Sequence, residues 1–466
     1  MKTTDAQTES KNKKLIDSII YAPYLLTMAL NDTDLHINYA VAIHEGKIIA
    51  IDTRNNIGSC YKATNTYKFS DHLLMPGFIN THGHIPMSIY AGKMPGGIPF
   101  DRIVFDYMLP LEREFCSRPQ AVYLGTLLGL NELIKYGVTT SAEMYYHSED
   151  IARAFSECGI RGVIGETILS EVPSPANRNA DEAIAYTRSF IKKWAKDPFV
   201  IPAIAPHAPY TVSDNYLEQS VELAKKYNVP LLMHVNETPE EVDSKKRDIF
   251  NSFYYMRPKV SVSPLEYLEK MDFFTHSKIT LAHCVYLTKK EIEILAKRKI
   301  GVSYNGVCNC SIGLAVAPVV ELLKAGIKMG IGTDGPMTND RLDILSQLKP
   351  LLTLVCSNYK DSTAISEYEL VYMATLGGAK ALHLDNLIGS IEVGKKADLI
   401  SIKIPPLERD MFYFTNNSPY TYLTRLCRAS QIEWTMVNGQ IPQRTFNPEL
   451  YKKMLPLLEE IKKWKP

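Results

Sequence analysis

The chain has 466 residues, of which 45% are hydrophobic and 22% charged, and its formal net charge is +1. This composition is ordinary for a globular enzyme, and the length is too great for one simple core, so we expect a large catalytic domain with a smaller companion. The near-neutral charge and the absence of a long basic stripe argue against nucleic acid as a partner.

The expected location is the reducing cytoplasm, without membrane association. The eight cysteines are scattered without a regular framework, and the chain starts with polar residues rather than a signal peptide. The longest apolar stretch near the start, residues 19–30, is interrupted by two tyrosines and a proline and is too short to span a bilayer.

Residues 16–70 carry short β-like patterns. Residues 38–44 and 47–51 read as two strands joined by the Glu45–Gly46 turn. We expect His44 and His72 of this region to lie on strand faces or at the surface rather than in a site.

From Gly77 onward, strand patterns alternate with amphipathic helix patterns. The first predicted strand ends at Thr81, and the others cover residues 138–143, 162–169, 200–205, 230–235, 279–283, 301–305 and 328–333. The helices between them are predicted at residues 124–136, 150–158, 180–194, 215–227, 264–271, 289–298 and 319–325. Eight βα units over roughly 250 residues predict an α/β fold with a closed (β/α)8 barrel of the TIM type.

The C-terminal segment returns to β character. A helix is predicted at 367–382, β structure at 389–402 and an amphipathic helix at 447–466. The N-terminal and C-terminal β segments are expected to pair into a small β-sandwich. The predicted domains are 1–75 (first part of the sandwich), 76–385 (catalytic barrel) and 386–466 (second part of the sandwich and terminal helix).

Titratable side chains follow five of the predicted strands, at the end of the barrel where such folds place their active sites. His82 and His84 end the first strand and, being two residues apart, project from the same face. The other strand ends carry His207, His234 with Glu237, His283, and Asp334. Any one of these could be an ordinary hydrogen-bonded polar residue, but five coincident strand ends favour a site.

The residue types indicate a metal centre with three imidazoles and one carboxylate. The expected ligands of one divalent ion per subunit are His82, His84, His234 and Asp334. Zinc is the first candidate and ferrous iron the alternative, and zinc lowers the pKa of a bound water to about 7. Glu237 is placed to shuttle protons, Asp334 to accept one from the water, and His283 to orient the attacking hydroxide. No lysine stands at a strand end to bridge a second metal.

Six motifs are highly specific in combination. They are residues 76–84, 206–211, 281–285, 317–319, 332–335 and 389–398. Together they resemble the amidohydrolase superfamily, in the branch of methylthioadenosine/S-adenosylhomocysteine deaminases and s-triazine hydrolases. The resemblance implies that His207 contacts the substrate, that Glu112 holds ribose hydroxyls, and that the protein is a homodimer or homotetramer.

Three positions depart from the deaminase pattern. Ile103 aligns with a tryptophan, and Tyr304–Ser311 replaces a His-x-Pro-x-Ser-Asn-x-Lys run. Glu166 aligns with an arginine that can pair with the carboxylate of S-adenosylhomocysteine in relatives. We therefore predict that Glu166 contacts the substrate and disfavours that compound. Two alternatives are that Glu166 is turned into a salt bridge or that the alignment is shifted by one residue.

Two further features concern the loops around the site. Cys308 and Cys310 are close in sequence but lack a second cysteine pair, so loop thiols are favoured over a metal site. Residues 93–111 are predicted to form a lid, with Gly96–Gly97 as its hinge and with Ile98, Phe100, Ile103 and Phe105 near the mouth.

The predicted reaction is hydrolytic deamination of an amino-substituted heteroaromatic ring, such as an adenosine derivative, purine or pterin, with release of ammonia. One alternative is removal of halide or alkylamine from an s-triazine. A second, from another functional class, is a non-catalytic metal-binding scaffold. The retained ligand set argues against the scaffold, and metal content per subunit would separate it from an enzyme.

Overall fold

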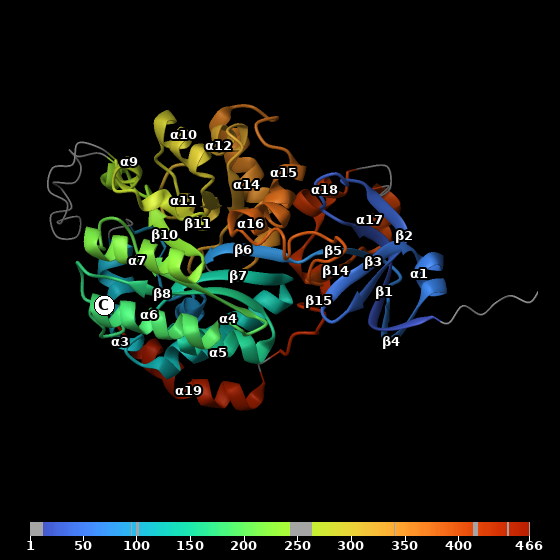
Figure 1. Cartoon of the computed structure of the whole chain (residues 1–466), viewed down its shortest axis with the longest axis horizontal. Coiled ribbons are helices and arrows are strands. Elements are labelled where there is room, and N and C mark those ends of the chain that lie inside the picture. The colour runs from blue at the N-terminus through green and yellow to red at the C-terminus, as the bar shows by residue number, and fades with distance from the viewer. Residues whose placement is uncertain are drawn as a thin grey trace, which may run out of the picture.

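The computed structural model describes residues 13–94, 96–98, 102–242, 263–339, 341–412, 418–444 and 447–465. A barrel of alternating strands and helices forms the larger part, and a smaller β part lies beside it (Figure 1). Of the predicted lid, Phe100 lies outside the described residues, as does the side chain of Phe105.

The larger part is the predicted (β/α)8 barrel. Its strands follow one another around the sheet in chain order, and every neighbouring pair is parallel. The sheet closes where Gly83 forms a parallel bridge with Asp334. The strands are β6 (Phe78–Gly83), β7 (Val138–Tyr145), β8 (Arg161–Ile168), β9 (Val200–Pro206), β10 (Leu231–Val235), β11 (Ile279–His283), β12 (Gly301–Tyr304) and β13 (Lys328–Ile331).

Helices cover the outside of this sheet, so the strands are buried on both faces, as in other barrels of parallel strands. Asn179 and Thr288 each cap a helix through a reciprocal pair of hydrogen bonds with a glutamate three residues later. The covering helices are α4 (Pro119–Lys135), α5 (Ser148–Cys158), α6 (Ala180–Trp194), α7 (Asp214–Tyr227), α9 (Pro264–Lys270), α10 (Lys289–Arg298), α12 (Val319–Lys324) and α14 (Ile344–Tyr359).

Short helical segments fill the connections at the two ends of the barrel. They are η1 (Ile85–Tyr90), η2 (Ile103–Met108), α3 (Leu109–Phe115), α8 (Pro239–Val242), η3 (Phe273–Thr275), α11 (Gly306–Ser311) and α13 (Pro336–Asn339). Among the described residues, no helix is both long and apolar enough to cross a membrane.

The smaller part pairs N-terminal with C-terminal strands, as predicted, and all seven strands connect into one mixed sheet. The long β1 makes this possible, because it pairs with β2 on one side and with β4 and then β5 on the other. The elements are β1 (Lys14–Leu26), β2 (Leu35–His44), β3 (Lys47–Thr53), α1 (Arg54–Cys60), β4 (Tyr61–Lys68), β5 (His72–Pro76), β14 (Leu399–Lys403) and β15 (Ile432–Met436).

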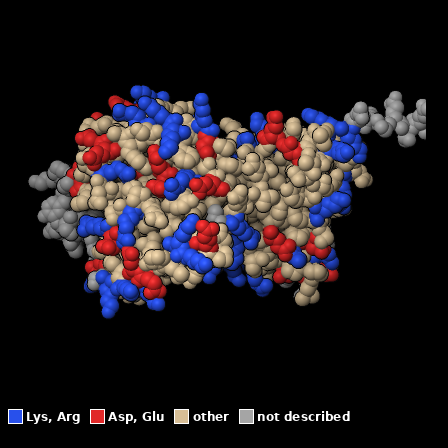
Figure 2. All heavy atoms as spheres, turned by 90° about the horizontal axis from the view of Figure 1, so that it is seen from below, with Lys and Arg blue, Asp and Glu red and all other residues tan. Residues whose placement is uncertain are grey.

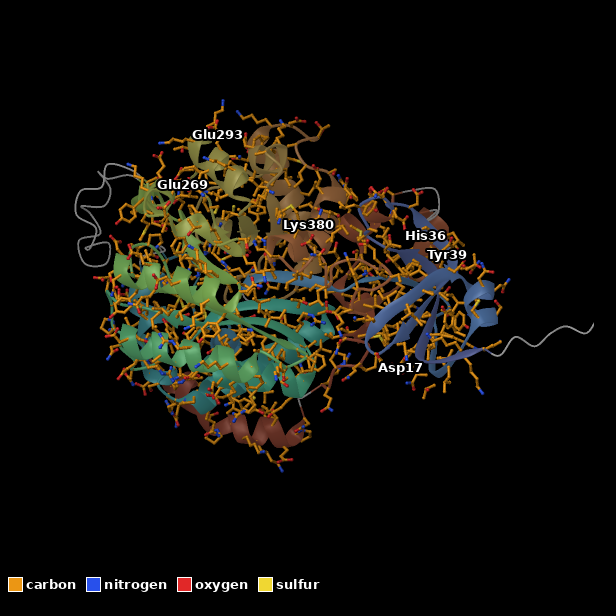
Figure 3. All side chains as sticks on the ribbon, in the orientation of Figure 1. Asp17, His36, Tyr39, Glu269, Glu293 and Lys380 are labelled. Atoms are coloured by element: carbon orange, nitrogen blue, oxygen red, sulfur yellow. The ribbon has the colours of Figure 1, made fainter. Side chains whose placement is uncertain are left out.

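The small sheet also holds histidines that are remote from the barrel mouth. His36 lies beside Tyr39 on β2, with ring centroids 4.7 Å apart, and Figure 3 shows both on the small part. The imidazole Nδ1 of His44 lies 3.1 Å from Asp17 Oδ1. His72 is buried, with its Nε2 3.1 Å from Glu433 Oε2. These histidines have local structural partners, in agreement with the expectation for His44 and His72.

Two predicted elements were wrong in detail. The helix expected at 367–382 is two helices, α15 (Glu367–Met373) and α16 (Leu376–Ala381). The break occurs because the carbonyl of Ala374 accepts a hydrogen bond from Ile79 of the barrel (2.9 Å) instead of continuing one helix. The β character expected at 389–402 is limited to β14 and to one isolated antiparallel bridge between Lys396 and Lys47, because most of the preceding residues form turns and bends.

The rest of the C-terminal segment runs from the small sheet back to the barrel. The predicted terminal helix is confirmed as α19, where Glu460 Oε2 accepts a hydrogen bond from Arg118 Nη1 (2.7 Å) at the start of α4. The elements are α17 (Pro406–Phe412), α18 (Pro419–Thr421), η4 (Tyr422–Leu426), η5 (Ala429–Gln431) and α19 (Pro448–Lys463). Basic and acidic side chains are interspersed on the face seen in Figure 2, which fits the near-neutral net charge.

A buried ion pair joins the two parts. Arg161, at the start of β8, donates from Nε to Asp398 Oδ2 (2.9 Å) and from Nη2 to Oδ1 (3.0 Å). Both side chains are 2% exposed. Asp398 also accepts from the backbone N–H of Asn438 through Oδ1 (2.7 Å) and from that of Gly77 through its carbonyl (3.0 Å). Gly77 lies between β5 of the small sheet and β6 of the barrel, so this contact is made where the chain passes from one part to the other. The division of the chain into domains at residues 75 and 385 stays a prediction.

Arg161→Met should destabilise the fold by about 3–5 kcal/mol, because it leaves the buried Asp398 carboxylate without its cation. The measurement is the urea unfolding midpoint of the purified variants. The matched control is Arg188→Met on the exposed face of α6, expected within about 0.5 kcal/mol of wild type. Equal midpoints for the two variants would contradict this role of the ion pair.

Candidate active site

The predicted site residues converge at the carboxyl-terminal ends of the barrel strands. One cavity is lined by most of the residues singled out from the sequence: His84, Glu112, His207, His234, Glu237, His283 and Asp334. His82 lies beneath them and is buried. The remaining walls are largely apolar and include Val104 and Met108 of the predicted lid and Tyr210.

Four imidazoles are packed together at the bottom of the cavity. The ring centroid of His82 lies 4.8 Å from that of His84, 4.8 Å from that of His234 and 5.3 Å from that of His283. Two groups of candidate metal ligands have their donor atoms within 4.8 Å of one another. They are His82 with His84 and His234, and His82 with His283 and Asp334.

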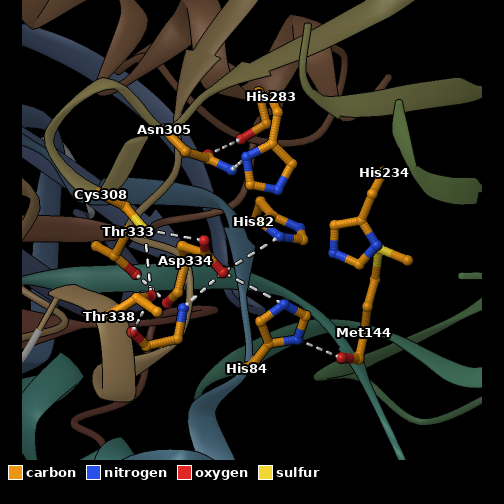
Figure 4. A network of polar contacts seen from close by, with 12 residues as sticks. His82, His84, Met144, His234, His283, Asn305, Cys308, Thr333, Asp334 and Thr338 are labelled. Atoms are coloured by element: carbon orange, nitrogen blue, oxygen red, sulfur yellow. Dashed lines mark hydrogen bonds and ion pairs between the residues drawn. The ribbon is translucent and has the colours of Figure 1, made fainter. Parts of the chain in front are cut away.

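Hydrogen bonds at Nδ1 orient three of these rings, those of His84, His234 and His283, and Figure 4 shows the bond between His84 and Met144. His84 Nδ1 lies 2.6 Å from the carbonyl of Met144, and His234 Nδ1 lies 2.8 Å from the carbonyl of His207. A carbonyl only accepts, so Nδ1 of each ring carries a hydrogen, and in the neutral form of each ring the lone pair is on Nε2. This arrangement, in which a protein acceptor fixes the tautomer of a histidine, is typical of metal ligands.

The donor set fits a divalent cation. His82 Nε2 is buried and has no hydrogen-bond partner among the described residues, so a lone pair on this nitrogen could bind a metal ion. Burial lowers the pKa of His82 to about 4 and that of His234 well below its usual range. Neutral imidazoles are the form that binds metal.

Asp334 supplies the negative charge of the cluster. Its Oδ1 lies 3.3 Å from His84 Nε2 and 3.7 Å from His82 Nε2, and it accepts the backbone N–H of Gly335 (2.7 Å). Burial opposes ionisation, but the neighbouring imidazoles hold the pKa of Asp334 well below its usual range. Burial also disfavours a charged His84, yet Asp334 raises the pKa of that imidazole to about 9. A divalent cation bound here would provide the positive charge next to Asp334 that a protonated His84 otherwise provides.

Glu237 lies beside the cluster without belonging to either ligand group. Its Oε1 is 3.6 Å from His283 Nδ1, and burial raises its pKa to about 8, with the charge of Asp334 acting in the same direction. The buried carboxylate of Glu241 fixes the Glu237 turn by accepting the backbone N–H groups of Asn236, Glu237 and Thr238. A carboxyl that holds its proton near neutral pH suits general acid catalysis.

Glu112 and His207 lie in the outer walls of the cavity. Burial raises the pKa of Glu112 to about 7, opposed by a hydrogen bond with Tyr145. His207 Nδ1 contacts Thr211 Oγ1 (2.9 Å), while its backbone carbonyl orients His234. His207 therefore has a structural role besides the predicted substrate contact.

Glu166 lies away from the cavity, whereas the sequence-based hypothesis expected it to contact the substrate. Its carboxylate is 1% exposed, and the cavity lining does not include it. Oε1 accepts from Arg178 Nη1 (2.7 Å), and Oε2 accepts the backbone N–H of Ser148 (2.8 Å) at the start of α5. This geometry matches the alternative of a salt bridge turned away from the substrate, since a buried carboxylate needs a cation.

Sequence reasoning missed three residues that hold the site together. Glu143 lies two residues before the end of β7 and accepts the backbone N–H of Ile85 (2.7 Å), directly after His84. Asn309 contacts His283, and the thiol of Cys308 contacts Asp334. Glu143 could have been recognised from the sequence as an acidic residue at the end of the predicted strand 138–143. The other two lie on α11, for which local sequence provides no comparable signal.

Comparison with known proteins agrees with this geometry. The profile of the Amidohydrolase family matches residues 73–441. The chain belongs to the amidohydrolase family. The chain is 34% identical to a 5-methylthioadenosine/S-adenosylhomocysteine deaminase of Thermodesulfovibrio yellowstonii over 90% of its length and 92% of the relative. It is 35% identical to a 5'-deoxyadenosine deaminase of Methanocaldococcus jannaschii, over 71% of this chain and 75% of that one.

Solved structures of other proteins share the whole architecture. An adenosine deaminase of Xanthomonas campestris with bound zinc superposes with a TM-score of 0.87 at 27% identity, covering 97% of this chain and all of that one. An atrazine chlorohydrolase of Arthrobacter aurescens, complexed with zinc, gives 0.81 at 19% identity, covering 95% of this chain and all of that one. At that identity the second likeness concerns the fold alone.

His234→Ala should lose metal and activity together, because His234 supplies one of the clustered imidazoles. Elemental analysis after dialysis should fall from about one ion per chain to near zero, the scale expected when one of four ligands is removed. The control is His276→Asn, since His276 is also buried but bonds the carbonyl of Val229 (2.8 Å) away from the cluster. Full occupancy in His234→Ala would refute the assignment.

Proposed function

We propose that this amidohydrolase is a metal-dependent aminohydrolase that deaminates adenosine derivatives and releases ammonia. The observation that carries the proposal is the position of Glu237. Its carboxyl faces the cavity beside the imidazole cluster yet outside both groups of candidate ligands. Such a residue can move a proton to and from the substrate without being tied to a metal.

The proposed ligands of one divalent ion are His82, His84, His234 and Asp334. Zinc is preferred because both zinc-containing structural relatives share the fold, and ferrous iron is the alternative. When bound, such an ion supplies hydroxide at neutral pH by lowering the pKa of a water.

The protein side chains then handle the protons. Glu237, protonated near neutral pH, donates to the ring nitrogen next to the carbon that bears the amine. Asp334 accepts a proton from the attacking water and passes it to the amine, which leaves as ammonia when the C–N bond breaks. The remaining hydroxyl proton returns to Glu237, and the ring carbon becomes a carbonyl. His283, held by Asn309, orients the attacking oxygen. The buried position of these groups strengthens each interaction, because little water competes with them.

The substrate class follows from the cavity wall and from the relatives. Glu112 is the proposed partner of the ribose hydroxyls, and His207 is proposed to contact the base. Two relatives at 34% and 35% identity are deaminases of adenosine derivatives by name. An s-triazine substrate has support only from neighbours in fold at 18–19% identity. A non-catalytic scaffold would not need Glu237 beside a complete set of ligands.

Two further properties complete the proposal. The protein is a homodimer or homotetramer, by resemblance to its relatives and with no nucleic-acid partner. Its location is the cytoplasm, which fits eight cysteines that are all free thiols. An ammonia-release screen of adenosine derivatives, purines, pterins and triazines on the metal-loaded protein tests the reaction directly.

Glu237→Gln should retain its metal and lower turnover by about 100-fold or more, because the amide cannot transfer a proton. The measurement is ammonia release at saturating substrate, together with metal content. The matched control is Glu222→Gln on the exposed face of α7, which should turn over at the wild-type rate. A Glu237→Gln variant as fast as this control would place the proton shuttle elsewhere.

Glu166→Gln distinguishes the two interpretations of that residue. If Glu166 only pairs with Arg178, the ratio of kcat/KM for S-adenosylhomocysteine to that for methylthioadenosine stays unchanged, while stability falls by about 1–3 kcal/mol. If instead the carboxylate repels the substrate anion, the same variant raises the ratio. Steady-state kinetics on both compounds and a urea unfolding curve decide between these outcomes.

A further inference from the structure

The thiol of Cys308 contacts the metal-site carboxylate directly. Cys308 lies on α11, is 1% exposed, and has its Sγ 3.0 Å from Asp334 Oδ2 and 3.1 Å from Thr338 Oγ1. Figure 4 shows the sulfur on the side of Asp334 opposite to the imidazoles. It belongs to the segment that departs from the deaminase pattern, at the position where that pattern has a serine.

The two oxygens of Asp334 have separate partners. Oδ1 accepts the N–H of Gly335 and faces His82 and His84, as described above. Oδ2 meets the sulfur of Cys308. An ionised carboxylate only accepts hydrogen bonds, so the hydrogen between them is that of the thiol. Thr338 donates its hydroxyl hydrogen to the carbonyl of Gly335 (3.1 Å) and contacts the sulfur from the other side.

This contact restrains rotation of the carboxylate. If Asp334 turned, both oxygens could face the cation, and the second would take the position that a catalytic site keeps open for water. Cys308 itself is absent from both groups of described residues whose donor atoms lie within 4.8 Å of one another. Its sulfur therefore acts on the carboxylate rather than on the ion.

We propose that Cys308 is a positioning residue that holds Asp334 as a one-oxygen ligand by donating its S–H to Oδ2. The inference rests on the proposed metal site. Because a thiol is a weaker donor than a hydroxyl, it also withdraws less charge from the carboxylate than a serine would. With cysteine at this position, Asp334 remains a stronger ligand and base than it would with serine. The weaker hydrogen bond, however, restrains rotation of the carboxylate less.

The test measures metal binding without substrate. Zinc affinity is determined by competition with a chromogenic chelator, and coordination by the visible spectrum of the cobalt(II)-substituted protein. Cys308→Ala and Cys308→Val remove the donor, and Cys308→Ser keeps one. Cys310→Ala, two residues along the same helix, is the control. Urea unfolding of the metal-free proteins identifies any variant that does not fold.

Loss of the donor should weaken zinc binding by about 10- to 100-fold, the usual effect of removing a group that orients a ligand. The cobalt spectrum should change as the second carboxylate oxygen joins the ion. Cys308→Ser keeps a donor to Oδ2, so it should restore the cobalt spectrum and recover most of the lost zinc affinity, and Cys310→Ala should match wild type. Zinc affinity and cobalt spectra unchanged in Cys308→Ala and Cys308→Val would overturn the proposal.

Two other results have distinct meanings. A thiolate-to-cobalt charge-transfer band in wild type that disappears in Cys308→Ser would make the sulfur a ligand and would also overturn the proposal. If His234→Ala bound zinc as tightly as wild type, the metal site itself would be wrong. If only the Cys308 variants behaved as wild type, the deaminase and its metal site would stand and this inference alone would fail.

Discussion

The site depends on one backbone hydrogen bond, from the N–H of Asp334 to the carbonyl of His82 (3.0 Å). It joins the first strand to a residue three positions beyond the end of the last strand and closes the barrel. The same bond brings a carboxylate next to two imidazoles although 251 positions separate the residues along the chain. One step lower, the side chain of Asn80 fixes the register, because its Nδ2 donates to Thr333 Oγ1 and its Oδ1 accepts the backbone N–H of Thr333 (both 2.9 Å). Closure of the fold and assembly of the candidate metal site are therefore one event.

Several chain turns at this end of the barrel use a left-handed backbone. His283 (φ 73°), Asp334 (φ 63°) and Asn236 (φ 51°) all have positive φ. Such a conformation costs of order 1–3 kcal/mol for a residue other than glycine and persists only where its surroundings enforce it. Here the enforcing contacts are the buried carboxylates and amides beneath the mouth, including Glu241 under Glu237. The strain ends each strand abruptly, and the functional side chain faces the cavity.

Much of this arrangement follows from local sequence. Apolar runs alternating with amphipathic helices predict the barrel, and polar residues at the ends of those runs predict His82, His84, His234 and Asp334. The features that local sequence could not predict also have physical causes. The break between α15 and α16 comes from a carbonyl that serves a distant strand, which no helical pattern records. The partner of Glu166 is Arg178, on a loop whose path depends on the finished barrel. Cys308 reaches Asp334 through tertiary packing, so its spacing to Cys310 was uninformative.

The bidentate pair of Arg161 and Asp398 has a consequence for synthesis of the chain. Domains tend to fold in order as the ribosome releases them, N-terminal first. Here the third barrel strand begins with a guanidinium whose carboxylate partner is made 237 residues later. The nascent barrel therefore carries an uncompensated charge at its base until the last strands of the small sheet emerge. Chains cut short before Asp398 should be substrates for chaperones and proteases rather than folded barrels.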